Sequence, residues 1–437
     1  MPFINVKRTE MNSTTLGKYR WRVCALLFVA TTINYIDRQV LGLLKTDLSA
    51  EFNWTETDYS NLVMAFSAAY SVGLLCFGAL IDKIGSKLGY AVSIAVWSLS
   101  AMAHGIVRST LGFGVVRSIL GVSEAGNFPA AIKATAEWFP KKERALATGI
   151  FNSGSNIAAV VGPVLVYWLA RNHGWRSAFV WTGAIGFIWL VLWWIYYEVP
   201  SKQKKLSKEE YDHIHSDQEE EGTGERIKWA KLLGVRQTYA FVFGKLLTDP
   251  VWWFFLFWLP GYLESIFHMD LKANLGLPII IIYSVTSLGS IGGGWLSSHL
   301  IKTGWPVFKA RKTSMLIFAI CVVPIMLIQY TNNLWIAIAL ISLATAAHQA
   351  WSATIFTTAS DMFPKRAVSS VVGIGGMAGS IGGTLFPMVI GAMLDHYKLL
   401  GNIGTGYNIL FTMCGVAYLV AWTVMHFFAP KMERVNL

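Results

Sequence analysis

Long apolar segments recur along almost the whole chain, separated by short polar stretches. Each is about 20 residues long, the length an α-helix needs to cross about 30 Å of hydrocarbon. We therefore expect an all-α membrane protein with twelve transmembrane helices. The predicted helices cover residues 23–45, 59–81, 88–107, 111–135, 145–170, 177–197, 239–263, 277–300, 313–331, 335–359, 367–394 and 405–428.

The composition agrees with a chain that lies mostly in lipid. Of its 437 residues 54% are hydrophobic and 14% are charged, whereas soluble proteins carry about 25% charged residues. The net charge is +11, but no basic stripe interleaved with aromatic residues lies outside the apolar segments. We therefore expect no nucleic-acid partner and attribute the positive charge to cytoplasmic loops.

Basic residues are concentrated in every other loop between the predicted helices, and therefore on one side of the membrane. This distribution indicates the orientation of the chain. They gather in the N-terminal tail and in the loops after the second, fourth, eighth and tenth helices. Residues 47–58, by contrast, hold four acids and no Lys or Arg. This alternation predicts that both termini are cytoplasmic. The apolar run from Val23 has no convincing small-residue cleavage site, so we expect it to be an uncleaved first helix.

One polar stretch, 198–238, interrupts the series between the sixth and seventh helices and includes the sequence SKQKKLSKEEYDHIHSDQEEEGTGERIK. It divides the chain into a bundle over 23–197 and a bundle over 239–428, flanked by cytoplasmic tails over 1–22 and 429–437. We expect the stretch to be a solvated cytoplasmic linker, because charge alone does not indicate regulation.

The two predicted bundles share an internal repeat. The sequence AEWFPKKERALATG (136–149) is similar to SDMFPKRAVSSVVG (360–373), and both lie where a fourth helix of a bundle meets the fifth. The same offset of 224 residues places Pro163 on Pro387. Related halves of equal topology predict a pseudo-twofold axis along the membrane normal, with a binding site near mid-membrane between the halves.

Six ionisable residues lie well inside predicted helices, and their charges sum to zero. A central charged residue costs about 2.5 to 3.5 kcal/mol to insert, so all six are expected to face the interior, a partner or a watery cavity. They are Asp37, Arg38, Arg117, Glu124, Lys245 and Asp249.

The spacing of these charges predicts their partners. Adjacent residues point about 100° apart on a helix, so the side chains of Asp37 and Arg38 are expected to face different surroundings. Arg117 and Glu124 share a face but lie about 10 Å apart along the helix axis, a gap that has room for a partner from the first helix.

Lys245 and Asp249 stand four residues apart and are predicted to pair on one face of the seventh helix. We assign them a gating or structural charge role.

A cation held at mid-membrane suits an anionic solute, because a guanidinium binds a carboxylate through two N–H bonds. We therefore predict that Arg38 grips the carboxylate of an anion, with Arg117 as a further binding residue. Asp37 and Glu124 are predicted to take up and release the coupling proton. An alternative stays open, in which these residues are ion pairs that lock the first helix to the fourth.

Several motifs resemble the major facilitator superfamily. GALIDKIGSKLG (78–89) is similar to its signature between the second and third helices, in which Asp82 can cap a neighbouring helix. RSILGVSEAGNFPAA (117–131) and GSNIAAVVGP (154–163) resemble its motifs in the fourth and fifth helices.

Within the superfamily, the chain most resembles the anion:cation symporters, and among them bacterial hexuronate transporters. The segments that carry this resemblance are NYIDRQVL, EAGNFPAAIKATAEWFP, LTDPVWWFFLFWLPGYL and AHQAWSATIFTTASDMFP. The resemblance implies the major facilitator fold of two pseudo-symmetric six-helix bundles. It also implies that Arg38, Asp37 and Glu124 have the roles assigned above, and that Tyr70 contacts the substrate.

A sugar acid also offers hydroxyl groups, for which we expect polar partners near mid-depth. The candidates are Tyr70, Asn156, His348, Gln349 and Ser352. Asn, Gln, Ser and His also form hydrogen bonds between membrane helices, and this alternative remains for each except Tyr70. Trp252 and Trp253 are either a wall on which the sugar stacks or packing residues.

The sequence thus predicts proton-coupled uptake of a hexuronate such as glucuronate or galacturonate by alternating access. Transport of galactonate or glucarate, organic-anion exchange and sodium coupling remain alternatives. A membrane enzyme is disfavoured because the chain contains no HExxH, GxSxG or CxxC motif, and a sensor because it has no sizeable soluble domain. We expect a monomer in the bacterial inner membrane, in contact with lipid, with no metal and no cofactor besides the proton.

Overall fold

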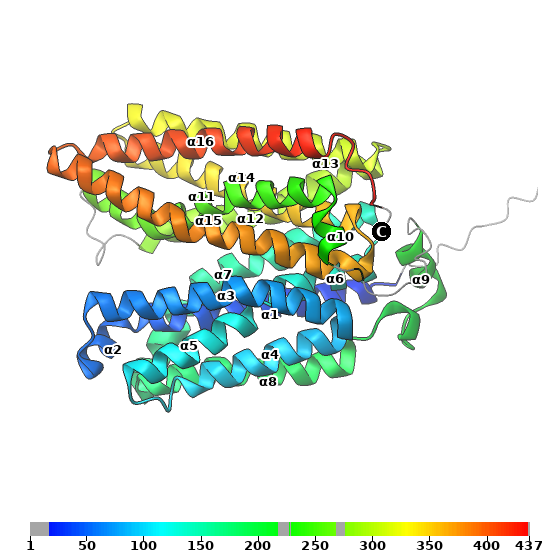
Figure 1. The fold of residues 1–437 in the computed structure, drawn as a ribbon, viewed down its shortest axis with the longest axis horizontal. Helices are drawn as coiled ribbons and strands as arrows, with labels where there is room; N and C mark the ends of the chain where they lie inside the picture. The colour runs from blue at the N-terminus through cyan, green and yellow to red at the C-terminus, as the bar shows by residue number, and fades with distance from the viewer. Residues whose placement is uncertain (1–16, 217–226, 228, 268–275, 436–437) are drawn as a thin grey trace, which may run out of the picture.

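The computed structural model describes residues 17–216, 227, 229–267 and 276–435. Every regular element within these ranges is a helix. The helices form two bundles that lie one above the other in Figure 1, the N-terminal half below and the C-terminal half above. The predicted all-α fold in two bundles is therefore confirmed.

The N-terminal bundle contains α1 (Tyr19–Leu43), α2 (Lys45–Phe52), α3 (Glu56–Ile84), α4 (Ser86–Ala103), α5 (Thr110–Glu124), α6 (Asn127–Trp138), α7 (Lys141–His173) and α8 (Trp175–Tyr196). The connection between the bundles contains the 3₁₀ helix η1 (Pro200–Lys202), α9 (Lys208–His215) and α10 (Trp229–Leu233). The C-terminal bundle contains α11 (Arg236–Phe267), α12 (Gly276–Lys302), α13 (Val307–Val322), the 3₁₀ helix η2 (Val323–Tyr330), α14 (Leu334–Met362), α15 (Lys365–Leu399) and α16 (Ile403–Phe428).

Eight helical segments of the described chain are long and apolar enough to cross a membrane: α3, α7, α8, α12, α13 with η2, α14, α15 and α16. The expected fourth span is divided between α5 and α6, which have 15 and 12 residues and are each too short to cross alone. The first and seventh expected spans, α1 and α11, carry ionisable residues within the helix.

The break in the expected span 111–135 has a local cause. α5 ends at Glu124, and α6 begins at Asn127. Pro129 has no N–H to donate, and in a continuous helix its ring would collide with the carbonyl of Ala125. The helix is therefore interrupted just before this proline, and the chain continues as a second helix.

The connection between the bundles is docked at α9, in contrast to the solvated linker expected over 198–238. Glu210 of α9 is 1% exposed. Its carboxylate accepts the backbone N–H groups of Tyr19 and Arg20 at 3.0 and 3.1 Å and pairs with the Arg20 guanidinium at 3.0 Å. The start of a helix leaves such N–H groups unsatisfied and favours a negative charge. Glu210 therefore fastens α9 to the start of α1.

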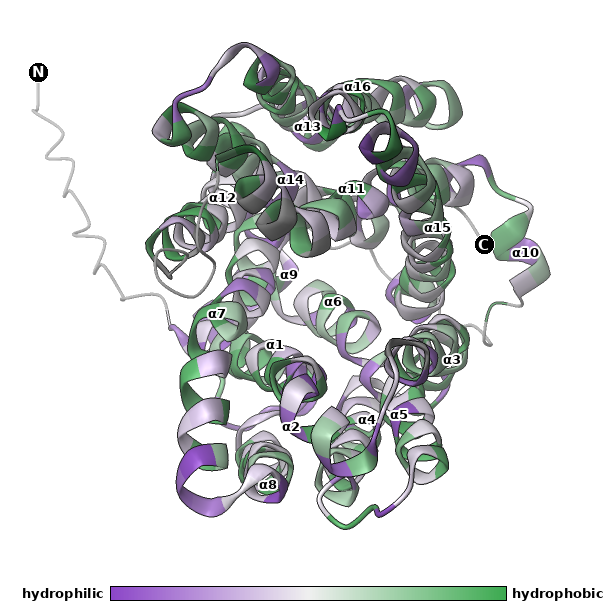
Figure 2. Cartoon of the chain, turned by 90° about the vertical axis from the view of Figure 1, so that its left-hand side faces the viewer, coloured by the Kyte–Doolittle hydropathy of each residue, from purple (hydrophilic) through white to green (hydrophobic). Residues whose placement is uncertain are grey.

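The two bundles pack closely at the end that carries α9, called here the α9 end. In this packing α3 lies against α15 and α7 against α12, as the end-on view of Figure 2 also shows. A Cβ at Gly373 of α15 would lie 2.2 Å from the Leu74 carbonyl oxygen, and one at Gly149 of α7 would lie 2.3 Å from that of Ser290. The internal repeat aligns these two glycines, so the two contacts are related as the pseudo-twofold axis predicts.

Charged contacts also join the bundles at the α9 end. Asp82 of α3 pairs with Lys133 at 3.0 Å and accepts the backbone N–H of Ser370 in α15 at 2.7 Å. Asp82 thus contacts a neighbouring helix near its start, while its role as a helix cap stays a prediction. Arg144 of α7 reaches Asp361 of α14 at 3.3 Å. The α9 end is therefore closed by both close packing and ionic contacts.

A methyl group at Gly373 should open this contact. Gly373→Ala places a Cβ against backbone, which cannot move aside as a side chain can. We expect faster labelling of a Ser370→Cys reporter by a water-soluble maleimide, because the α9 end spends more time open. The reporter keeps the backbone N–H that Asp82 accepts. Gly391→Ala, in the same helix, is the matched control because its added Cβ has no neighbouring atom within 4 Å. Equal labelling rates in the two variants would contradict the expectation.

Candidate functional site

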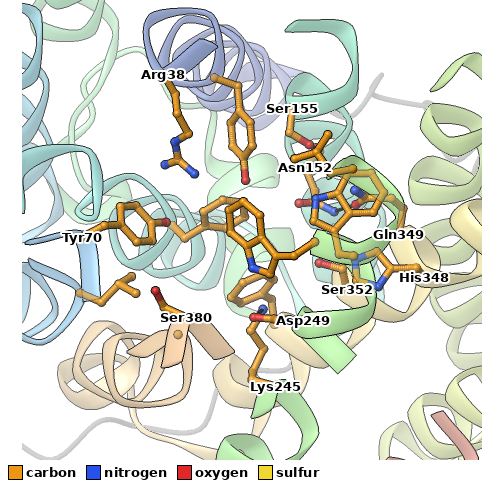
Figure 3. Close-up of a pocket in the computed structure, with 18 of the residues that line it drawn as sticks. Arg38, Tyr70, Asn152, Ser155, Lys245, Asp249, His348, Gln349, Ser352 and Ser380 are labelled. Atoms are coloured by element: carbon orange, nitrogen blue, oxygen red, sulfur yellow. Dashed lines mark hydrogen bonds and ion pairs between the residues drawn. The ribbon is translucent and has the colours of Figure 1, made fainter. Parts of the chain in front are cut away.

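A cavity of about 130 Å³ lies between the two bundles. The N-terminal bundle contributes residues of α1, α3, α6 and α7, and the C-terminal bundle contributes residues of α11, α14 and α15. Figure 3 shows the polar side chains converging on this space from both sides. The charged residues that line it are Arg38, Lys245 and Asp249.

Arg38 extends from α1 toward the cavity (Figure 3), although most of its side chain is buried. Its Nε donates to Oε2 of Glu124 at 2.9 Å. The guanidinium also lies over the rings of Tyr35 and Tyr70, 4.7 and 4.6 Å from their centroids. These contacts hold the cation by cation–π attraction and by one ionic bond, and they orient it toward the space between the bundles.

The gap predicted between Arg117 and Glu124 is filled by Arg38. Glu124 is fully buried and pairs with Arg38, while Arg117 donates from Nη2 to the backbone carbonyl of Arg38 at 3.2 Å. Arg117 does not line the cavity and instead lies over the ring of Phe66 at 4.9 Å. The predicted partner from the first helix is therefore confirmed, and the cavity receives one of the two arginines.

Asp37 lies away from the cavity, as expected from its angle to Arg38. It is 1% exposed and does not line the cavity. The Thr182 hydroxyl of α8 approaches it, but neither carboxylate oxygen accepts a hydrogen bond of good geometry from the described residues. Burial of a polar group without a hydrogen bond is costly, so this carboxyl stands out as a candidate for proton uptake.

The opposite wall carries a second charge pair. Lys245 Nζ lies 2.9 Å from Asp249 Oδ2 on α11, which confirms the predicted i,i+4 pairing. The ammonium also lies over the ring of Phe356 in α14, 4.2 Å from its centroid. Both charged residues line the cavity.

Three of the predicted polar residues lie together on α14. His348, Gln349 and Ser352 all line the cavity. Asn156 of α7 does not line it, but accepts a bond from Gln349 at 3.4 Å. Asn152, one turn earlier on α7, lines the cavity and donates to Gln349 at 2.7 Å. The predicted region of α7 therefore reaches the cavity, but through Asn152 and not through Asn156.

Aromatic side chains also form part of the wall. Trp252, Trp253 and Tyr70 line the cavity. The Trp252 ring stacks on the His348 ring with centroids 4.9 Å apart and planes within 7°, and His348 Nδ1 bonds to the Tyr418 hydroxyl. Trp252 therefore both packs against a neighbour and faces the cavity.

Sequence reasoning did not find Asn152, Ser155 and Ser380, which also line the cavity. Asn152 stands one turn before Asn156 on the same face, so its polarity in an apolar helix was a usable signal. Ser380 lies in the glycine-rich part of α15 and shares a 2.7 Å hydrogen bond with Ser71 of α3. No sequence signal distinguished that serine from its small neighbours.

The fold and the site define a multi-pass membrane protein with a charged cavity between its halves. The chain matches the family model of the Major Facilitator Superfamily over residues 27–387. It is 33% identical over 414 residues to the hexuronate transporter of Escherichia coli (strain K12), a match that covers 93% of this chain and 94% of that protein. It is 29% identical over 440 residues to the probable galactarate/D-glucarate transporter GarP of the same organism, covering 96% of each.

The solved structures show the same fold. The proton:xylose symporter XylE has a TM-score of 0.73 at 16% identity, covering 95% of this chain and 97% of that one. The chain therefore belongs to the Major Facilitator Superfamily, whose members are membrane transporters and not enzymes. Among the residues that the structure describes, no group of three or more His, Cys, Asp or Glu side chains is placed to hold a metal ion.

Arg38→Ala should destabilise the protein more than Glu124→Gln does. The first change leaves the buried Glu124 carboxylate without its ionic partner, a loss that costs about 3–5 kcal/mol in buried pairs. The second leaves Arg38 between two aromatic rings at the cavity edge. The midpoint of thermal unfolding in detergent micelles measures both.

Two further variants make the comparison specific. The double variant Arg38→Ala/Glu124→Gln should regain part of the stability lost in Arg38→Ala, because it no longer buries an unpaired charge. Arg176→Ala breaks an ion pair whose side chains are 47% and 39% exposed, and should change the midpoint little. An unfolding midpoint for Arg38→Ala equal to that of the unaltered protein would refute the structural role of the pair.

Proposed function

We propose that this protein takes up a sugar-acid anion, a hexuronate such as glucuronate or galacturonate, by proton symport. The observation that carries the proposal is the Arg38 guanidinium directed into a cavity between two bundles. A guanidinium matches the geometry of a carboxylate, and the surrounding amides and hydroxyls match the hydroxyls of a sugar. The 33% identity to a hexuronate transporter supports the same substrate class.

The substrate carboxylate and Glu124 compete for Arg38 in this mechanism. When Glu124 is ionised it holds Arg38 through the 2.9 Å contact. A proton on Glu124 removes that charge and leaves the guanidinium available to the substrate carboxylate. Asp37, buried without a hydrogen-bonded partner among the described residues, is the second acid that takes up and releases a proton. Arg117 acts through the backbone of Arg38, which it contacts.

Alternating access then follows from the arrangement of the two bundles. Close packing and the contacts of Asp82 and Arg144 hold the α9 end shut, and their separation opens the cavity toward that side. We place the α9 end in the cytoplasm, because the basic loops lie on that side. The protein works as a monomer in the bacterial inner membrane, with both termini cytoplasmic and the proton as coupling ion.

Uptake into proteoliposomes tests the proposed function. An inward proton gradient should accelerate uptake of labelled glucuronate, and Arg38→Ala should abolish binding and uptake because the carboxylate loses its ionic partner. Arg176→Ala, which removes an exposed arginine that does not line the cavity, should transport normally. Uptake that requires a preloaded anion would indicate exchange, and normal substrate binding by Arg38→Ala would refute the assignment of Arg38.

The role of Glu124 in coupling predicts a separation of two rates. Glu124→Gln keeps the shape of the side chain but cannot carry the coupling proton. Accumulation driven by a proton gradient should therefore fall by a larger factor than exchange of labelled for unlabelled glucuronate at equal pH. Glu51→Gln, at an exposed carboxylate outside the cavity, is the control. Undiminished accumulation by Glu124→Gln would eliminate Glu124 as a coupling acid.

A further inference from the structure

The first helix of each bundle brings one cation to the cavity, each with a carboxylate partner at 2.9 Å. The two pairs differ in where their carboxylates lie. Glu124 sits behind Arg38 and does not line the cavity, whereas Asp249 lines it beside Lys245. Figure 3 shows Arg38 on one side of the cavity and the Lys245–Asp249 pair on the other.

The pair on α11 is poorly suited to a purely structural role. Both members belong to one helix, so their ionic bond does not join α11 to a neighbour. Burial of an ion pair rarely stabilises a fold more than apolar residues of similar volume do. The pair nevertheless faces the cavity, where a solute can form bonds with both groups.

The surrounding helices leave room for the carboxylate. A Cβ at Gly379 of α15 would lie 2.0 Å from Asp249 Oδ2, so a larger residue there would displace it. Lys245 carries three N–H donors; one is directed at Asp249, and the ammonium rests on the Phe356 ring. The pair therefore presents both a donor and an acceptor to the cavity while its net charge is zero.

We propose that Lys245 and Asp249 receive the end of the sugar acid opposite its Arg38-bound carboxylate, and that Asp249 selects against a second carboxylate at that end. The inference rests on the proposed function. A hydroxyl both donates and accepts hydrogen bonds, and an ammonium beside a carboxylate supplies both complements. A second carboxylate meets an ammonium already neutralised by Asp249 and is repelled by the Asp249 charge.

Galacturonate and galactarate provide a matched pair of ligands. They share six carbons and the configuration of their hydroxyls and differ at one end, carbon 1, which carries the hemiacetal hydroxyl in the galacturonate ring and is a carboxylate in open-chain galactarate. In the proposed binding mode that end lies at the Lys245–Asp249 pair. The unaltered protein should therefore prefer galacturonate. Asp249→Asn removes the repulsion and leaves the Lys245 charge unbalanced, so this variant should gain affinity for galactarate.

Calorimetric titration of the purified full-length protein with each ligand tests this. The ratio of dissociation constants should move toward galactarate by at least about tenfold in Asp249→Asn, equivalent to about 1.4 kcal/mol. Lys245→Gln/Asp249→Asn removes both charges together and should return the ratio close to that of the unaltered protein. Asp249→Ser carries the same expectation as Asp249→Asn if the asparagine variant does not fold.

Glu198→Gln is the matched control. It removes the carboxylate of another lysine pair, Lys87–Glu198 at 2.8 Å, which lies outside the cavity lining. Its ligand ratio should equal that of the unaltered protein.

The possible failures are distinguishable. If galacturonate binds and depends on Arg38, but the ligand ratio does not change in the Asp249 variants, this inference is wrong and the proposed function stands. A preference for galactarate in the unaltered protein also overturns the inference. If neither sugar acid binds the unaltered protein, the proposed function fails and the inference fails with it.

Discussion

The cost of a charge inside a membrane is the constraint on which the rest of this structure depends. Arg38 and Glu124 are stable at their depth because each neutralises the other and because aromatic rings enclose the guanidinium. Their pair joins α1 to α5 within the N-terminal bundle. The Lys245–Asp249 pair lies within a single helix of the C-terminal bundle. Each bundle therefore carries its own compensated charges, and a movement of one bundle against the other separates neither pair.

The contacts that cross between the bundles are of a different kind. Around the cavity, the bond from Asn152 to Gln349 joins neutral amides, which water or a solute hydroxyl can replace at modest cost. At the α9 end the crossing contacts are close glycine packing and ionic bonds, including the one from Arg144 to Asp361. The Arg144 and Asp361 side chains are 4% and 7% exposed, and opening of the α9 end would replace their mutual contact with contacts to water. The interface between the bundles is thus held by interactions that can be exchanged for solvent, as a moving interface requires.

Part of the site was predictable because it follows from the geometry of single helices. The pairing of Lys245 with Asp249 follows from their spacing along one helix. The gap between Arg117 and Glu124 likewise follows from their spacing along another. Which of the polar residues of α7 line the cavity was not predictable, so Asn152 was missed while Asn156 was named. The docking of α9 was also missed, because Glu210 looks like any other acid in a charged segment until the start of α1 is placed beside it.

The sequence by itself determined the membrane spans, the division into two related halves, and the set of charges that must be shielded from lipid. These follow from hydrophobic length and from the cost of a lone charge, which are local properties of the chain. The tertiary structure decided which of those charges reach the cavity: Arg38 and not Arg117, Asp249 and not Asp37. That choice depends on how each helix is rotated and tilted against its neighbours, and side-chain packing between helices sets both.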